Sequence, residues 1–94
     1  MSSADKIKDP KTAMYVTDYV WGSGNLGFRE MHKAFGLKPQ NQMSKQLLDR
    51  INTNPDSLNI LHNSRTSFYR KIAVGNQRKW LKGWLNRAND LFNL

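Results

Sequence analysis

The sequence feature that most constrains the fold is the spacing of the apolar residues near the C-terminus. They recur every three or four positions over residues 81–92, which places them on one face of an α-helix. They are Leu81, Trp84, Leu85, Ala88, Leu91 and Phe92. The positions between them are mostly Lys, Arg and Asn. The segment therefore predicts an amphipathic helix with a polar, basic outer side, on which Trp84 belongs to the core-facing stripe.

The run at residues 14–21, MYVTDYVW, is the most ambiguous part of the chain. Asp9 followed by Pro10 predicts a helix start, with Asp9 as the N-cap and Pro10 at the first helical position. The run itself is rich in aromatic and β-branched residues, which favours a strand. No second strand-like run is present to pair with it, and an isolated strand leaves its backbone groups without partners. We therefore expect a buried helix here.

Gly22, Gly24 and Gly27 match the spacing G-x-G-x-x-G that is typical of dinucleotide-binding turns. That interpretation needs a second parallel strand after the following helix. Residues 37–42 instead form a turn-like sequence, and another helical pattern follows. The glycines are therefore interpreted as a tight corner between two helices, with Ser23 or Asn25 capping the second one.

Helix-ending and helix-starting residues divide the rest of the chain into short segments. Gly36 ends the second helix with Leu37 folded back on its last turn, and Ser44 caps the third. Asn54-Pro55-Asp56 repeats the cap-plus-proline start for a fourth helix, which Gly75 ends before Asn76 caps the fifth. The predicted inward positions are Phe28, Met31 and Phe35 in the second helix, Leu47, Leu48 and Ile51 in the third, and Leu58, Leu61, Phe68 and Ile72 in the fourth.

These segments together predict an all-α fold, a small single domain of about five short helices around one core. The domain comprises residues 10–94, and residues 1–9 are expected to be a flexible N-terminus. A chain of 94 residues is long enough for one modest core.

Composition limits the partners and cofactors. The chain has no cysteine and two histidines, His32 and His62, so we expect no disulfide, no zinc or other metal site and no cofactor. The formal net charge is +8, which favours an anionic partner such as nucleic acid, an anionic membrane surface or the acidic bacterial wall. No apolar run approaches the roughly 20 residues that a membrane-spanning helix needs.

Two blocks of the sequence resemble a known family. One covers residues 15–51 and includes Trp21-Gly22-Ser23-Gly24 and the stretch REMHKAFGLKPQNQMSKQLLDRI. The other contains SRTSFYRKIA and QRKWLKGWLNRANDL. Together they are similar to the C-terminal, predicted peptidoglycan-binding part of phage-type N-acetylmuramidases, also called secretion-activator proteins. The resemblance covers about 80 of the 94 positions, and its most specific elements are Arg65/Tyr69/Arg70 and Gly83/Trp84/Leu85/Arg87.

The helix–Gly–turn–helix piece also resembles the repeat of small peptidoglycan-binding modules, with three departures. Met31-His32 stands where these modules usually have Leu-Gln, Gln40-Asn41 replaces Asp-Gly, and Ser44 replaces Gly. These differences put the integrity of that repeat's ligand groove in question.

The resemblance implies a cell-wall recognition module without catalytic residues of its own. The family's catalytic glutamate lies in a Glu-Gly-Gly-type segment that this sequence lacks, and the single glutamate, Glu30, matches a non-catalytic stretch. A glycosidase ordinarily needs a proton-bearing carboxylic acid and a second carboxylate, and the spacing of Asp18 and Glu30 does not favour that role. We expect no independent hydrolase activity. A separate muramidase chain is then a candidate partner.

The expected ligand-binding surface lies in the C-terminal third, where seven Lys or Arg residues and no Asp or Glu occur from Arg65 to Arg87. Aromatic and cationic residues suit sugars and anionic wall groups. The candidates are Tyr69, Arg70, Lys79, Trp80 and Lys82. The alternatives are a basic helical nucleic-acid-binding domain, or a phage structural or lysis-associated protein that kept the fold.

The N-terminus is polar where a signal peptide would have its apolar segment. A phage-type origin implies a protein that stays in the cytoplasm until lysis or a holin releases it, or one that belongs to the phage particle.

Arg65 falls within the apolar stripe of the fourth helix. A buried guanidinium needs a partner, and Asp18 is the best-placed acid because its neighbours Tyr15, Tyr19 and Trp21 are also apolar or aromatic. The sequence predicts a structural ion pair between Asp18 and Arg65. Alternatively, Arg65 extends along the helix to solvent.

Overall fold

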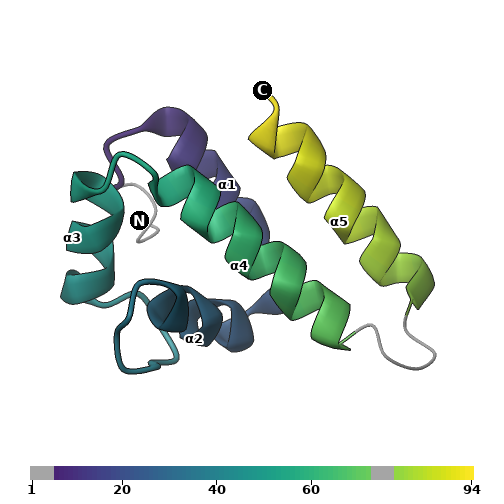
Figure 1. Cartoon of the computed structure of the whole chain (residues 1–94), viewed down its shortest axis with the longest axis horizontal. Helices are drawn as coiled ribbons and strands as arrows, with labels where there is room; N and C mark the ends of the chain where they lie inside the picture. The colour runs from purple at the N-terminus through teal and green to yellow at the C-terminus, as the bar shows by residue number, and fades with distance from the viewer. Residues whose placement is uncertain (1–5, 73–77) are drawn as a thin grey trace.

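Five helices make up the described part of the chain. The computed structural model describes residues 6–72 and 78–94, with the backbone alone for 78–80. The helices are α1 (Pro10–Ser23), α2 (Asn25–Ala34), α3 (Lys45–Thr53), α4 (Ser57–Ile72) and α5 (Arg78–Phe92), as Figure 1 shows. The described residues contain no strand. The prediction of an all-α fold with five short helices is therefore confirmed.

The start of α1 follows the predicted cap. The Asp9 carboxylate accepts hydrogen bonds from the Thr12 backbone N–H at 3.0 Å and from the Thr12 hydroxyl at 2.6 Å, and Pro10 is the first helical residue. These two bonds, the hydroxyl first, hold the pKa of Asp9 below its ordinary value. Tyr15 and Tyr19 lie one turn apart and are both fully buried. The run at 14–21 is thus helical and not a strand.

The corner between α1 and α2 consists of one residue, Gly24. Its φ of 58° lies in the left-handed region that glycine adopts without strain, and its N–H donates to the Val20 carbonyl at 2.7 Å. Gly24 itself occupies the N-cap of α2, without a side-chain hydrogen bond. The predicted cap by Ser23 or Asn25 is therefore wrong. Ser23 instead donates its hydroxyl to the Tyr19 carbonyl at 2.6 Å.

α2 ends and α3 begins at the residues predicted from the sequence, and the side chain of His32 connects the two helices. Gly36, with φ 73°, donates to Lys33 O, and Leu37 donates to His32 O at 2.8 Å, which together form a Schellman motif. Ser44 caps α3 by accepting the Leu47 N–H at 3.1 Å. The Ser44 hydroxyl also lies 2.7 Å from Nε2 of the fully buried His32. His32 Nδ1 lies 2.6 Å from the Phe28 carbonyl, which can only accept, so Nδ1 carries a proton and donates this bond.

Residues 6–8 are held against α3, although the N-terminus was expected to be flexible as far as residue 9. The Asn52 side chain accepts from the Lys8 N–H at 2.9 Å and donates to the Lys6 carbonyl at 3.1 Å. Ile7, between them, is 6% exposed and belongs to the core. Residues 6–8 are therefore bonded to α3, and residues 1–5 lie outside the described part of the chain.

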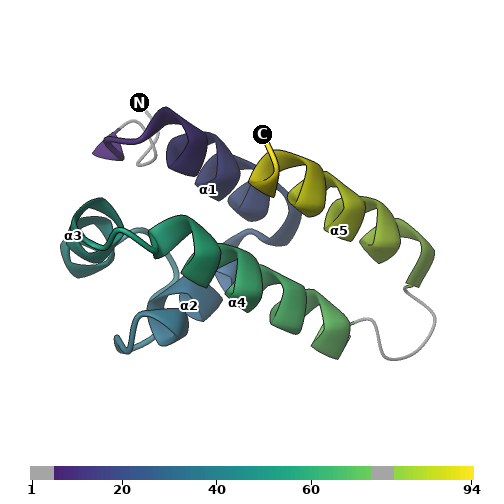
Figure 2. The ribbon, with the colours of Figure 1, turned by 45° about the horizontal axis from the view of Figure 1, so that its top comes forward.

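Helix α4 is the central element. It packs against each of α1, α2, α3 and α5, and α5 lies along both α4 and α1 (Figures 1 and 2). It begins at Ser57, two residues later than Pro55, after Asn54 accepts the Asp56 N–H at 2.9 Å. Leu61 and Phe68 are buried as predicted, whereas Ile72 at the end of α4 is 37% exposed. The predicted break at Gly75 and cap at Asn76 lie outside the described residues.

One hydrophobic core joins all five helices. The radius of gyration is 12.5 Å, close to the ~12 Å expected of a folded domain of this length. The buried apolar residues from α1 to α5 are Tyr15, Val16, Tyr19, Met31, Leu47, Ile51, Leu61, Phe68, Tyr69, Leu81, Ala88 and Leu91. The α5 stripe predicted from spacing faces this core, with Trp84, Leu85 and Phe92 partly buried at its edges.

Candidate functional site

A buried ion pair lies where α1, α4 and α5 meet. Arg65 of α4 is 1% exposed, and its Nη2 donates to Asp18 Oδ2 of α1 at 2.8 Å. The other carboxylate oxygen, Oδ1, lies 3.5 Å from Arg87 Nε of α5. The carboxylate of Asp18 thus connects three helices, and Arg65 does not extend to solvent.

Three tyrosine rings surround the Arg65 guanidinium. Its Cζ lies 5.3 Å from the ring centroids of Tyr15, Tyr19 and Tyr69, within the range of cation–π attraction. Among the described residues, Arg65 Nε and Nη1 and the hydroxyls of Tyr19 and Tyr69 find no hydrogen-bond partner. The three rings and the Asp18 carboxylate, which we call the Arg65 cage, therefore hold the cation mainly by the Asp18 contact and by the ring faces.

Burial shapes the acid–base properties of this cage. Burial alone lowers the pKa of Arg65, but the hydrogen bond to Asp18 and the tyrosines outweigh it, so the net shift is upward. Burial also raises the pKa of Tyr15 to about 12 and raises that of Tyr19 further. With their pKa raised, Tyr15 and Tyr19 stay neutral at physiological pH, while the Arg65 guanidinium stays charged.

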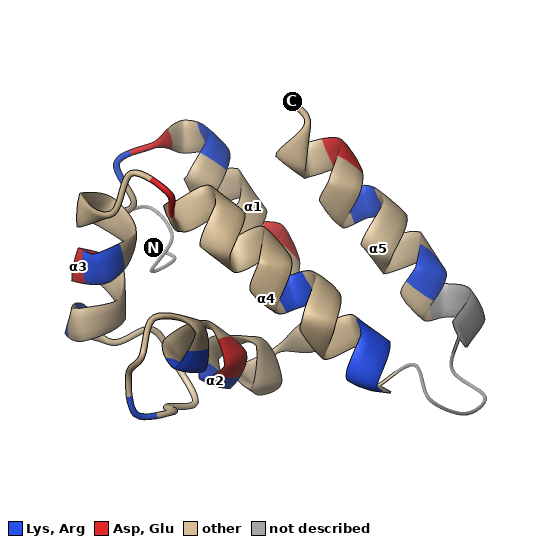
Figure 3. Cartoon of the chain, viewed as in Figure 1, with Lys and Arg blue, Asp and Glu red and all other residues tan. Residues whose placement is uncertain are grey.

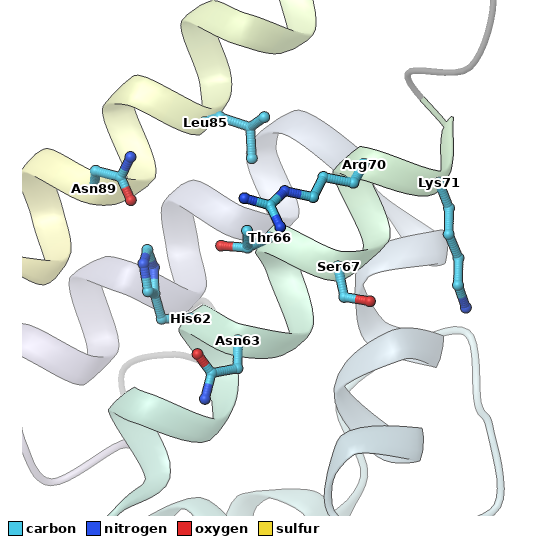
Figure 4. A pocket seen from close by; sticks show the side chains of 8 residues that line it. All are labelled: His62, Asn63, Thr66, Ser67, Arg70, Lys71, Leu85 and Asn89. Atoms are coloured by element: carbon cyan, nitrogen blue, oxygen red, sulfur yellow. The ribbon is translucent and has the colours of Figure 1, made fainter.

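A surface groove of about 740 Å³ runs between α4 and α5 (Figure 4). We call it the α4–α5 groove, and it is lined by His62, Asn63, Thr66, Ser67, Arg70, Lys71, Leu85 and Asn89. Figure 4 shows Arg70 reaching from α4 toward α5, where Leu85 and Asn89 face it, whereas Lys71 extends away from α5. The described lining contains two cations, two amides and two hydroxyls, and no carboxylate.

His62 forms part of the groove and is tied to the core. Its ring stacks on Phe92, with centroids 4.2 Å apart, and its Nδ1 lies 2.6 Å from the Tyr15 hydroxyl. The Tyr15 hydroxyl and Nδ1 therefore share a hydrogen bond that ties the ring to α1. Burial first, and the charge of Arg65 second, lower the pKa of His62, against a hydrogen bond with Asn89 that raises it.

The predicted contact residues separate into different environments. Arg70 lines the α4–α5 groove, and Lys82 is exposed on α5. Tyr69 is fully buried against Arg65 and Trp84, so its ring cannot touch a ligand and its place on the predicted contact surface is corrected. The side chains of Lys79 and Trp80 lie outside the described part of the structure.

Neither acid considered for catalysis lies in the groove. Asp18 is held by Arg65 and Arg87, and Glu30 Oε1 of α2 is paired with Lys33 Nζ at 3.6 Å. The described residues contain no group of three His, Asp or Glu side chains that is arranged to hold a metal ion. The groove can bind a polar or anionic group, and its described lining offers no carboxylic acid for general acid catalysis.

Sequence reasoning missed most of the groove. It selected residues by positive charge and aromatic character, whereas the lining includes Asn63, Thr66, Ser67 and Asn89, which are neutral and polar. Basic side chains are also spread over all five helices (Figure 3). The usable signal was the polar edge of each amphipathic helix, because two such edges border a groove when the helices pack together.

Comparisons with protein-family models, curated proteins and solved structures found no match. In the described part of the chain, none of the helices has the length and apolarity to cross a lipid bilayer.

Proposed function

We propose that the chain is a cell-wall recognition module that binds peptidoglycan, or another anionic wall polymer, in the α4–α5 groove. The observation that supports this proposal is the composition of the groove, in which a cation stands among amides and hydroxyls. An acetylated, carboxylate-bearing glycan carries complementary groups along its length. The resemblance to the C-terminal part of phage-type muramidases leads to the same class of ligand.

The individual groups in the groove suit such a ligand. The side-chain amides of Asn63 and Asn89 can each donate and accept, as the hydroxyl and acetamido groups of a glycan require. The planar guanidinium of Arg70 matches a carboxylate with two parallel hydrogen bonds. A volume of about 740 Å³ is within the range of about 300–1,000 Å³ typical of small-ligand sites.

A basic domain that binds nucleic acid is the competing proposal, because Arg70 and Lys71 suit phosphate as well as carboxylate. The two ligands differ in their dependence on salt. Binding to phosphates is driven by the release of counterions, so its affinity falls steeply as the salt concentration rises. Contacts between neutral amides and sugar groups depend little on salt.

Co-sedimentation with purified sacculi and a gel shift with duplex DNA, each at low and at physiological salt, distinguish the two. We expect retention on sacculi to persist in part at the higher salt and DNA binding to be lost. Asn63→Ala with Asn89→Ala should remove the salt-resistant part, and Arg70→Ala the salt-sensitive part. Lys38→Ala, which removes one exposed cation away from the groove, is the matched control for Arg70→Ala and should change little.

Two results would contradict the cell-wall proposal. The first is tight DNA binding with no retention on sacculi at either salt concentration. The second is retention that none of the groove substitutions weakens, since the polymer would then bind elsewhere on the chain.

A further inference from the structure

An exposed tryptophan lies on the other side of α5 from the groove. Trp21 of α1 is 88% exposed, although tryptophan is on average a strongly buried residue. Met14, two turns earlier on the same helix face, is 49% exposed. A ligand that covers this indole and thioether would remove apolar surface from water, which is favourable.

A fixed polar edge borders this apolar pair. With Thr17, Asp18 and Arg87, the two residues line a shallow hollow of about 280 Å³, which we call the Trp21 surface. Asp18 is held by Arg65 on one oxygen and by Arg87 on the other, so its position is set by the core. The Arg87 side chain is 61% exposed, which leaves its guanidinium accessible from solvent.

We propose that the Trp21 surface is a saccharide subsite, in which one pyranose ring stacks on Trp21 while its hydroxyls bond to Asp18 and Arg87. This inference rests on the proposed cell-wall function and adds a second contact to it. A pyranose has an apolar C–H face and a rim of hydroxyls that both donate and accept. Trp21 provides the apolar face, Asp18 the acceptor and Arg87 the donors.

The carboxylate favours a sugar over a nucleic acid at this position. A nucleobase can also stack on an exposed indole, but the phosphates of a nucleic acid only accept hydrogen bonds, whereas the Asp18 carboxylate needs donors such as the hydroxyls of a sugar. The α4–α5 groove differs, because its described lining has cations and no carboxylate. The Trp21 surface therefore suits a neutral hydroxyl-rich ring, and the groove suits an anionic substituent of the same polymer.

The two surfaces flank a single helix. Leu85 and Asn89 of α5 line the groove, and Arg87 lines the Trp21 surface. Two positions along a helix correspond to about 200° of rotation around its axis, which places these side chains on opposite flanks of α5. A helix is about 10–12 Å across, so a glycan strand of several sugars that crosses the exposed side of α5 would reach both surfaces.

The test follows the indole N–H signal of Trp21 in two-dimensional ¹H–¹⁵N NMR spectra of the full chain, assigned by its loss in Trp21→Phe. The β-1,4-linked tetramer of N-acetylglucosamine, a short single-stranded DNA and increasing protein concentration are the three titrations. We expect the tetramer to shift this signal and the other two to leave it in place. Arg87→Ala should weaken the tetramer's affinity about tenfold, whereas Leu26→Ala, which trims another exposed apolar residue outside this surface, should not.

Each other result overturns the saccharide subsite. A shift with DNA alone indicates a base-stacking site, a shift with protein concentration alone indicates a contact between copies of the chain, and no shift with millimolar tetramer indicates no site. The two proposals remain separable. A tetramer-dependent shift without retention on sacculi supports the subsite and rejects the cell-wall function, whereas retention on sacculi with no shift rejects the subsite alone.

Discussion

A guanidinium keeps its proton in any protein environment, so the burial of Arg65 dictates what surrounds it. The desolvation of a full charge is costly, and here one carboxylate and three tyrosine rings offset it. Removing Arg65 would leave Asp18 with Arg87 alone and would open a space among the three rings. The residue that looks like part of a basic binding surface in the sequence is therefore a structural element of the core.

Arg65→Ala is expected to lower the free energy of unfolding by roughly 3–5 kcal/mol, because it breaks a buried pair and leaves a cavity. The measurement is a chemical or thermal unfolding curve followed by circular dichroism. Arg70→Ala is the matched control on the same helix: its side chain is exposed, so we expect a change within about 0.5 kcal/mol. Equal unfolding curves for Arg65→Ala and the parent would show that the buried pair contributes nothing to stability.

His62 should make the fold less stable in mildly acidic solution. Its pKa in the folded protein lies below the ordinary 6.5, so its contribution to stability is complete above that value. As the pH falls below it, the unfolded chain binds the proton first and the contribution is lost. Groups from three helices face the ring: Tyr15 from α1, Arg65 from α4, and Asn89 and Phe92 from α5, with Arg70 in the same groove.

The test compares urea unfolding of the parent and of His62→Phe at several values between about pH 7 and pH 5. Phenylalanine keeps an aromatic ring beside Phe92 but does not titrate. The other titrating groups are the same in both proteins, so the difference between the two curves isolates His62. We expect the parent to lose more stability than the variant as the pH falls. Parallel losses would mean that His62 titrates alike in the folded and unfolded chains.

At the scale of the helices, signals within a few residues of each other were reliable. The caps at Asp9 and Ser44 and the Schellman motif at Gly36 each depend on local hydrogen bonds, so sequence spacing was enough to predict them. The N-cap of α2 was missed because α1 ends immediately before it. Gly24 serves as the C-cap of one helix and the N-cap of the next, which leaves no separate position for a capping side chain.

Contacts between helices were predictable from the sequence only where a buried charge needed an oppositely charged partner. Arg65 and Asp18 lie 47 positions apart, yet an apolar stripe on each helix indicated that the two charges would meet. The α4–α5 groove had no such signal, because it depends on which polar edges the crossing of two helices brings together. The exposure of Trp21 could have been predicted from the sequence. Trp21 lies two positions after the inward-facing Tyr19, and residues two positions apart lie on opposite sides of a helix.

At the scale of the whole molecule, the described lining of the α4–α5 groove contains no carboxylate. The positive charge is spread over every helix, and the uncharged polar groups gather beside Arg70 on one flank of α5. The two acids considered for hydrolysis, Asp18 and Glu30, both serve as ion-pair partners, Asp18 between three helices and Glu30 with Lys33 on α2. A glycosidase instead needs one acid that keeps its proton beside the scissile bond.

The purified chain is therefore expected to bind purified sacculi without clearing them. A turbidity or dye-release assay measures this, with an authentic muramidase as the positive control for the substrate. Glu30→Gln leaves the fold largely intact because glutamine keeps the shape of the side chain and the Glu30–Lys33 pair, at 3.6 Å and partly exposed, contributes little, about 0–1 kcal/mol. Clearing by the parent that disappears in Glu30→Gln would make the chain a hydrolase and would contradict the recognition role. Clearing that survives in Glu30→Gln but disappears in Asp18→Asn would contradict the recognition role equally and would make Asp18 the catalytic acid. The fold of Asp18→Asn is verified by circular dichroism.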